Sequence, residues 1–199
     1  FAGTVVNNDY AVISADNNTA ISISNMGTVI NSGYAKISAG TLSISMDEGE
    51  ILNTDNASII SENAGAIFFW REGTVRNSGN AVISAGTNTA ISFSHSGTII
   101  NTDNAVISAN DEYAIAISND GSVINNGNAT ITSSHSSIFI LGEGFISNSN
   151  NASILATNVG AISINSGMVI NTDDAIISAA NGYGIAFGAN GTVINSDNG

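Results

Sequence analysis

Residues 97–120 read GTIINTDNAVISANDEYAIAISND, and this 24-residue stretch recurs with small changes along the whole chain. It opens with a glycine and an apolar run, passes through an Asn-rich turn, and continues with two short runs in which apolar residues alternate with Ser or Ala. Alternation of this kind with β-branched residues is typical of strands that bury one side. Each copy of the repeat therefore predicts three short strands separated by turns.

A glycine marks the start of each copy and defines the period. Successive starts lie 24, 22, 24, 24, 24, 23, 23 and 24 residues apart. The glycines are Gly3, Gly27, Gly49, Gly73, Gly97, Gly121, Gly144, Gly167 and Gly191. A unit of this size cannot bury its own apolar side, so neighbouring units must stack around one core. We predict an all-β, right-handed parallel β-helix (β-solenoid) with three short strands per coil and roughly eight coils, forming a single domain over residues 1–199.

Each position of the repeat becomes a column in such a stack. With the glycine as position 1, position 3 is Val or Ile in every coil and position 5 is Asn in every coil. The position 5 residues are Asn7, Asn31, Asn53, Asn77, Asn101, Asn125, Asn148, Asn171 and Asn195. An inward amide at a solenoid corner can bond the amides above and below it. We therefore predict a structural ladder of asparagines.

Position 4 is predicted to face outward, because position 3 faces inward. It is apolar in all coils except those with Arg76 and Ser147. The apolar members are Val6, Ile30, Leu52, Ile100, Ile124, Ile170 and Ile194. A long exposed apolar column indicates an interaction surface, unless a twist or bulge of the strand buries both positions.

Two coils carry large apolar residues in the third strand, where the other coils alternate with Ser. By alternation Phe68 and Trp70 face outward in one coil, and Phe139 and Leu141 face outward three coils later. Arg71 directly follows Trp70. Exposed aromatic residues beside Arg are typical of surfaces that stack sugar rings or seat a partner protein. The variable turns could equally cover these side chains.

Composition excludes several classes of partner. The net charge of −13 repels nucleic acid and anionic lipid headgroups. The chain has no cysteine, and no apolar run approaches the roughly 18 residues that span a bilayer. We therefore predict no nucleic-acid partner and no membrane span.

Acidic residues are the candidates for chemistry, and we expect them in turns or linking segments. They are Asp47, Glu48, Glu50, Asp111, Glu112, Asp173 and Asp174. No Lys, Arg or His recurs beside them to complete a catalytic site. We predict that the protein is not an enzyme and uses no cofactor, with a surface Ca²⁺ held by Asp173 and Asp174 as the alternative.

The units Gly-Thr-Val-Ile-Asn-Ser, Asn-Ala-Val-Ile-Ser-Ala and Ala-Ile-Ser resemble the passenger-type parallel β-helices of bacterial autotransporter adhesins and related repeat-containing exoproteins. The resemblance covers nearly all of the chain. It implies an extracellular location, on the bacterial cell surface or in a secreted matrix, and no catalytic residues are carried over. The implied function is a non-catalytic structural or adhesive scaffold. The implied partners are further copies of the chain, joined end to end or laterally, or a host or cell-surface glycan or protein.

Three alternatives remain open at this point: a carbohydrate-binding β-helix, a glycan-cleaving β-helix, and an ice-binding solenoid. The last rests on an interrupted column of Thr at position 2, formed by Thr4, Thr28, Thr74, Thr98 and Thr192. Neither end of the sequence carries an obvious cap, and uncapped solenoid ends are exposed strand edges. We therefore expect either a fragment of a longer solenoid or a filament subunit.

Overall fold

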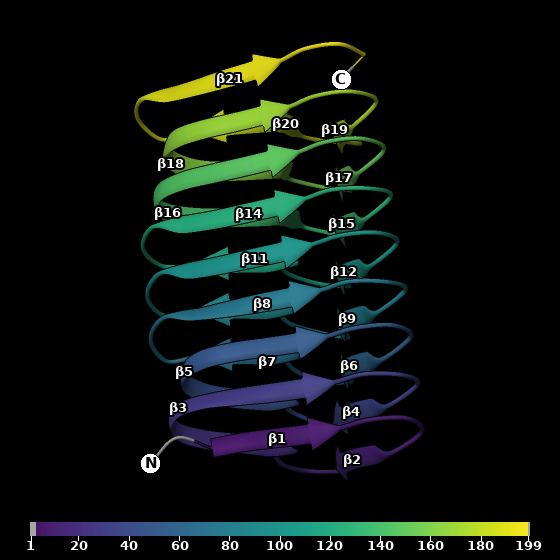
Figure 1. Ribbon diagram of the computed structural model, residues 1–199. Coiled ribbons are helices and arrows are strands. Elements are labelled where there is room, and N and C mark those ends of the chain that lie inside the picture. Colours follow the sequence, from purple (N-terminus) through teal and green to yellow (C-terminus); the bar gives the residue numbers. More distant parts are fainter. Residues whose placement is uncertain (1–2, 199) are drawn as a thin grey trace.

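The computed structural model describes residues 3–198, which form strands and turns and no helix. The chain winds in a right-handed sense and rises by one coil at each repeat, so the whole forms a rod (Figure 1). Strands of successive coils pair in parallel, in one sheet of 8 strands and one of 13 strands. The predicted parallel β-solenoid is therefore confirmed.

Each coil contributes a first, a second and a third segment. The first segments include β1 (Gly3–Asn7), β8 (Gly73–Asn77), β11 (Gly97–Asn101), β14 (Gly121–Asn125) and β21 (Gly191–Asn195). The second segments are β2 (Val12–Ala15), β4 (Lys36–Ala39), β6 (Ser58–Ser61), β9 (Val82–Ala85), β12 (Val106–Ala109), β15 (Thr130–Ser133), β17 (Ser153–Ala156) and β19 (Ile176–Ala179). The third segments include β7 (Ile67–Phe69), β10 (Ile91–Phe93), β13 (Ile115–Ile117) and β20 (Tyr183–Phe187).

In four coils the third segment runs without a break into the next first segment, which the sequence did not predict. These long strands are β3 (Ile21–Asn31), β5 (Ile44–Asn53), β16 (Ser136–Asn148) and β18 (Gly160–Asn171). They join the first and third segments into the 13-stranded sheet, while the second segments form the 8-stranded sheet.

Equivalent positions of the repeat lie directly above one another. Gly97 pairs with Gly121 and Asn101 with Asn125 in the first segments, and Ile107 pairs with Ile131 in the second. The inward Ile and Val side chains of the central coils are fully buried. Each such side chain contributes about 1.5–3 kcal/mol through removal of apolar surface from water. The stack of like residues therefore supplies the core that a single coil lacks.

The asparagine ladder forms as predicted. Each Nδ2 donates to the Oδ1 of the asparagine in the next coil over 2.8–2.9 Å. Asn101 also donates to the carbonyl oxygens of Ala105 (3.2 Å) and Thr130 (3.2 Å), and it is completely buried. One side chain thus closes its own corner and ties that corner to the next coil.

A second, exposed asparagine ladder runs in the opposite direction, three positions after the first. Here the later coil donates to the earlier one: Asn80 to Asn56, Asn104 to Asn80, and Asn128 to Asn104, over 3.0–3.1 Å. The two columns of amides therefore point in opposite directions along the rod.

Position 7 adopts the left-handed backbone conformation in every coil from the first to the last. Asp occupies it at φ values such as 63° for Asp55 and 65° for Asp103, and Gly occupies it in the coils of Gly33 and Gly79. The Asp55 carboxylate accepts the backbone N–H of Gly33, and that of Asp103 accepts the N–H of Gly79. The alternation of Asp with Gly thus pairs the Asp55 and Asp103 carboxylates with a donor in the preceding coil.

Candidate functional site

The predicted outward column on the first segments is present. Ile100 and Ile124 are half-buried while their neighbours Ile99 and Val123 are completely buried, and the register of β11 with β14 is unbroken. No bulge therefore turns position 4 inward in these strands. Each member is partly covered by the members above and below it, and exposure rises to 58% at Val6 and 43% at Ile194.

This column lies on a face with almost no charge. Among the position 2 and position 4 residues of all coils, Glu50 is the single carboxylate and Arg76 the single cation. They form a salt bridge with 2.8 Å between Nε and Oε1. A protein of net charge −13 therefore has one long face that carries no net charge.

The aromatic residues of the third and sixth coils face outward, as predicted. Trp70 is 60% exposed, contacts Phe68 edge-on with ring centroids 4.8 Å apart, and donates through Nε1 to Ser45 Oγ. Arg71 is held by salt bridges to Asp47 (3.6 Å) and Glu48 (3.2 Å). The guanidinium therefore has partners within the protein.

The sixth-coil residues have a different environment. Phe139 stacks on Tyr113 from the variable turn of the preceding coil, with ring centroids 4.9 Å apart, whereas Leu141 is 55% exposed. Phe68 and Phe139 belong to one column, in which Ser92 and Ala116 lie between them. The variable turn that contains Tyr113 thus partly covers Phe139, whereas Trp70 in the third coil remains exposed.

The acidic residues do not all lie where the sequence placed them. Asp47, Glu48 and Glu50 lie within the long strand β5 rather than in a turn. Asp173 accepts the backbone N–H of Asn150, and Asp174 accepts Nδ2 of Asn198, so these two carboxylates bond to different partners. Within residues 3–198 no group of three or more acidic or histidine side chains is arranged to hold a metal ion.

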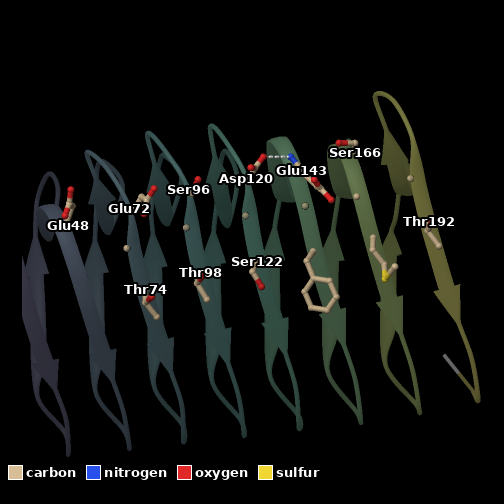
Figure 2. Close-up of a pocket in the computed structure, with 18 of the residues that line it drawn as sticks. Glu48, Glu72, Thr74, Ser96, Thr98, Asp120, Ser122, Glu143, Ser166 and Thr192 are labelled. Atoms are coloured by element: carbon tan, nitrogen blue, oxygen red, sulfur yellow. Dashed lines mark hydrogen bonds between the residues drawn. The ribbon is translucent and has the colours of Figure 1, made fainter.

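A groove that the sequence did not predict runs along the rod where the third segments meet the first segments (Figure 2). It has a volume of about 1210 Å³. One wall is formed by the residue that precedes each glycine, the other by the residue that follows it, and the glycine column lies between the two rows. The preceding residues are Met26, Glu48, Glu72, Ser96, Asp120, Glu143, Ser166 and Asn190.

The glycines form the floor for a reason that lies in the core. A Cβ added to one of these glycines would point inward and overlap a core side chain. It would lie 2.3 Å from Phe69 at Gly73, 2.6 Å from Phe93 at Gly97, and 2.5 Å from Ile117 at Gly121. Large inward side chains thus require glycine at position 1 of these three coils. Because the outward residues on both sides do carry side chains, the bare backbone between them becomes a trough.

The groove has an acidic wall and a hydroxyl wall. Glu72, Asp120 and Glu143 are exposed and form no salt bridge with any residue in the described range. The opposite wall carries Thr74, Thr98, Ser122, Phe145, Met168 and Thr192. The signal for this site is present in the sequence as a column of mostly polar residues directly before the glycine, outside the alternating runs that predict strands.

The chain matches no protein-family model, no curated protein and no solved structure. Across residues 3–198 there is no helix with the length and apolar character needed to cross a membrane.

Proposed function

We propose that the protein is a non-catalytic extracellular scaffold of bacterial surfaces that adheres through the face of its first segments, as the resemblance to autotransporter passengers implies. The observation that carries the proposal is the outward apolar column, which extends from Val6 to Ile194 with two interruptions. Exposed apolar side chains that follow one another in adjacent coils, as Ile100 with Ile124 and Ile170 with Ile194, are typical of an interaction surface.

The partner that fits this face best is a second copy of the same chain, packed side by side. Two rods of net charge −13 repel each other through most of their surfaces. The first-segment face is the exception, because its Glu50 and Arg76 neutralise each other. Lateral packing through this face buries the isoleucine column without bringing carboxylates together.

Charge introduced into the middle of the column tests the proposal. The double variant Ile100→Glu/Ile124→Glu places two carboxylates in the contact and is expected to abolish association, since like charges and desolvation both oppose it. Sedimentation velocity over a range of protein concentrations measures the association. The matched control is Ser84→Glu/Ser108→Glu, which adds the same charge to the second-segment face, where both serines are half-buried.

The wild-type protein and the control are expected to associate to the same extent. A wild-type protein that sediments as a monomer at every concentration, or a control that dissociates like the isoleucine variant, contradicts lateral packing through this face.

Carbohydrate binding is the second candidate function. The groove along the rod favours it, because one wall carries four carboxylates, the other carries four hydroxyl groups, and the floor is bare backbone. Hydroxyl and carboxylate side chains are the donors and acceptors that recognise sugar hydroxyls.

A further inference from the structure

The groove repeats its chemistry with the period of the strands. Its walls extend from Met26 to Asn190, which is seven coil steps or about 34 Å at about 4.8 Å per step. The same three elements recur at each step: an outward residue, a glycine and a second outward residue (Figure 2). A site of this form suits an extended polymer that lies parallel to the rod, rather than a compact ligand.

The charge of the acidic wall selects a cation. Glu72, Asp120 and Glu143 lie in the third, fifth and sixth coils, and none of them has a cationic partner in the described part of the chain. Glu48, one coil before Glu72, in contrast forms a salt bridge with Arg71, which also pairs with Asp47. Asp120 accepts the backbone N–H of Glu143 at 2.8 Å, which fixes the orientation of its carboxylate. The central groove thus presents three carboxylates without a cationic partner, the first two separated by Ser96 and the last two in adjacent coils.

The opposite wall selects hydroxyl groups. Thr74, Thr98 and Ser122 stand in register in three successive coils, and all three are half-buried. Phe145 and Met168 continue this wall and supply apolar contact. A ligand that fills the groove therefore needs ammonium groups along one edge and hydroxyl groups along the other.

We propose that the groove binds a linear polymer of amino sugars whose amines are free. This inference rests on the carbohydrate-binding candidate above and names its ligand class. The protonated amines that face the acidic wall, which belong to every second sugar, form charge-assisted hydrogen bonds with its carboxylates. The ring hydroxyls bond to the threonine and serine row, and the C–H faces of the rings lie over the glycine floor. Several such contacts along one chain act together, so affinity increases with polymer length until the groove is filled.

The spacing disfavours a cationic peptide as the occupant. An extended peptide presents side chains on one side every two residues, or about 6.6 Å, whereas the unpaired carboxylates of the groove lie two coils and then one coil apart, about 9.6 and 4.8 Å. In an extended β-1,4-linked pyranose chain each ring is turned over relative to the one before it, so the amines on one edge recur at every second sugar. That repeat is close to the two-coil separation of Glu72 and Asp120, about 9.6 Å. A simple polyamine satisfies the acidic wall and leaves the hydroxyl wall unused.

Calorimetric titration of the whole chain with a hexamer of β-1,4-linked glucosamine tests the assignment, at a pH where its amines are protonated. We expect binding that weakens with added salt. The triple variant Glu72→Gln/Asp120→Asn/Glu143→Gln keeps the shape of the wall and removes its charge. It is expected to weaken binding by at least about tenfold, because charge-assisted hydrogen bonds are lost. The matched control Asp16→Asn/Glu62→Gln/Asp111→Asn removes three exposed carboxylates outside the groove and is expected to bind like the wild type.

A second variant, Thr74→Val/Thr98→Val/Ser122→Ala, removes the opposite row of hydroxyls without changing charge. It is expected to weaken binding of the hexamer and to leave spermine binding unchanged. Circular dichroism confirms that each variant retains its strands.

The outcomes separate this inference from the candidate on which it rests. If the fully N-acetylated hexamer binds as tightly as the free amine, and the groove variants abolish that binding, carbohydrate binding stands and the amino-sugar assignment is overturned. If spermine or hexalysine binds as tightly as the glucosamine hexamer, the groove recognises charge alone and the assignment is overturned. Equal losses in the groove triple variant and its control, or no binding of either hexamer, overturn both.

Discussion

At the scale of single residues, the buried asparagines show why one amide can be required at one position of every coil. The Asn101 side chain accepts from Asn77 and donates to Asn125, and its Nδ2 lies within hydrogen-bonding distance of two carbonyl oxygens. No other side chain is both donor and acceptor with this reach. A carboxylate at this position has no N–H to donate, yet the groups around it, Ala105 O, Asn125 Oδ1 and Thr130 O, are all acceptors.

Replacing Asn101 by Asp is therefore expected to destabilise the protein by at least about 3 kcal/mol, because a charge is buried and the donors to Asn125, Ala105 and Thr130 are lost. Urea unfolding followed by circular dichroism measures the loss. The control is Asn104→Asp, in the exposed ladder of the same coil, which is expected to cost less than about 1 kcal/mol. Equal losses at the two positions would contradict a special role for the buried ladder.

The residue pattern predicted which side chains face inward and why asparagine is invariant, since alternation and column identity are both visible in the sequence. It did not predict the groove. Glu72, Asp120 and Glu143 lie between the alternating runs, in links where no alternation of apolar and polar residues indicates which way a side chain points. Their common orientation follows from the backbone path through the glycine, which depends on the bulk of Phe69, Phe93 and other inward residues.

At the scale of elements, the length of the link between the third and first segments decides the local backbone. The link is one residue shorter before Gly49 and Gly167 than before Gly27 and Gly144, and the pairing absorbs the difference with a register shift. Gly49 and Gly167 are the position 1 glycines with positive φ, at 134° and 126°. A shortened link thus forces a conformation that only glycine adopts readily.

The variant Gly49→Ala is expected to destabilise the protein by at least about 2 kcal/mol, from backbone strain and from steric overlap. Its Cβ would lie 1.9 Å from the carbonyl oxygen of Gly27, which is backbone and cannot rotate away. The control is Gly3→Ala, where an added Cβ meets no heavy atom within 4 Å. Thermal unfolding compares the two, and a Gly49 variant as stable as the Gly3 variant would refute the account of the short link.

The strand boundaries illustrate what sequence periodicity leaves out. Coil lengths of 22 and 23 residues show that residues are missing, but they do not show whether a turn or a link has lost them. The link is shortened before Gly49 and Gly167, whereas the coil that contains Phe139 has a shorter variable turn. Whether the link or the turn is shortened decides whether hydrogen bonding continues through the link, as it does in the long strands β5 and β18.

At the scale of the whole molecule, stacking of equivalent coils makes the rod modular. Deletion of residues 97–120 joins Ser96 to Gly121 and sets the coil of Gly79 beneath that of Gly127, so that no two position 7 carboxylates become neighbours. We expect this deletion variant to keep its strand content and to shorten by one strand spacing, about 4.8 Å. Circular dichroism and small-angle scattering measure the two quantities.

The control for the deletion removes only half a coil, residues 97–108. It places second-segment residues over first segments and breaks every column above the junction, so it is expected to lose cooperative unfolding. A half-coil deletion that folds as well as the whole-coil deletion would show that the columns do not govern the stack.

The strands lie across the axis of the rod, and this has a mechanical consequence. A coil adds about 5 Å to the length of the rod, yet its 24 residues span about 80 Å when drawn out straight. Tension applied along the axis opens the end coil first, one hydrogen bond after another, and leaves the coils behind it intact. A tether built in this way lengthens more than tenfold before the chain is fully extended, and it opens coil by coil rather than in one event.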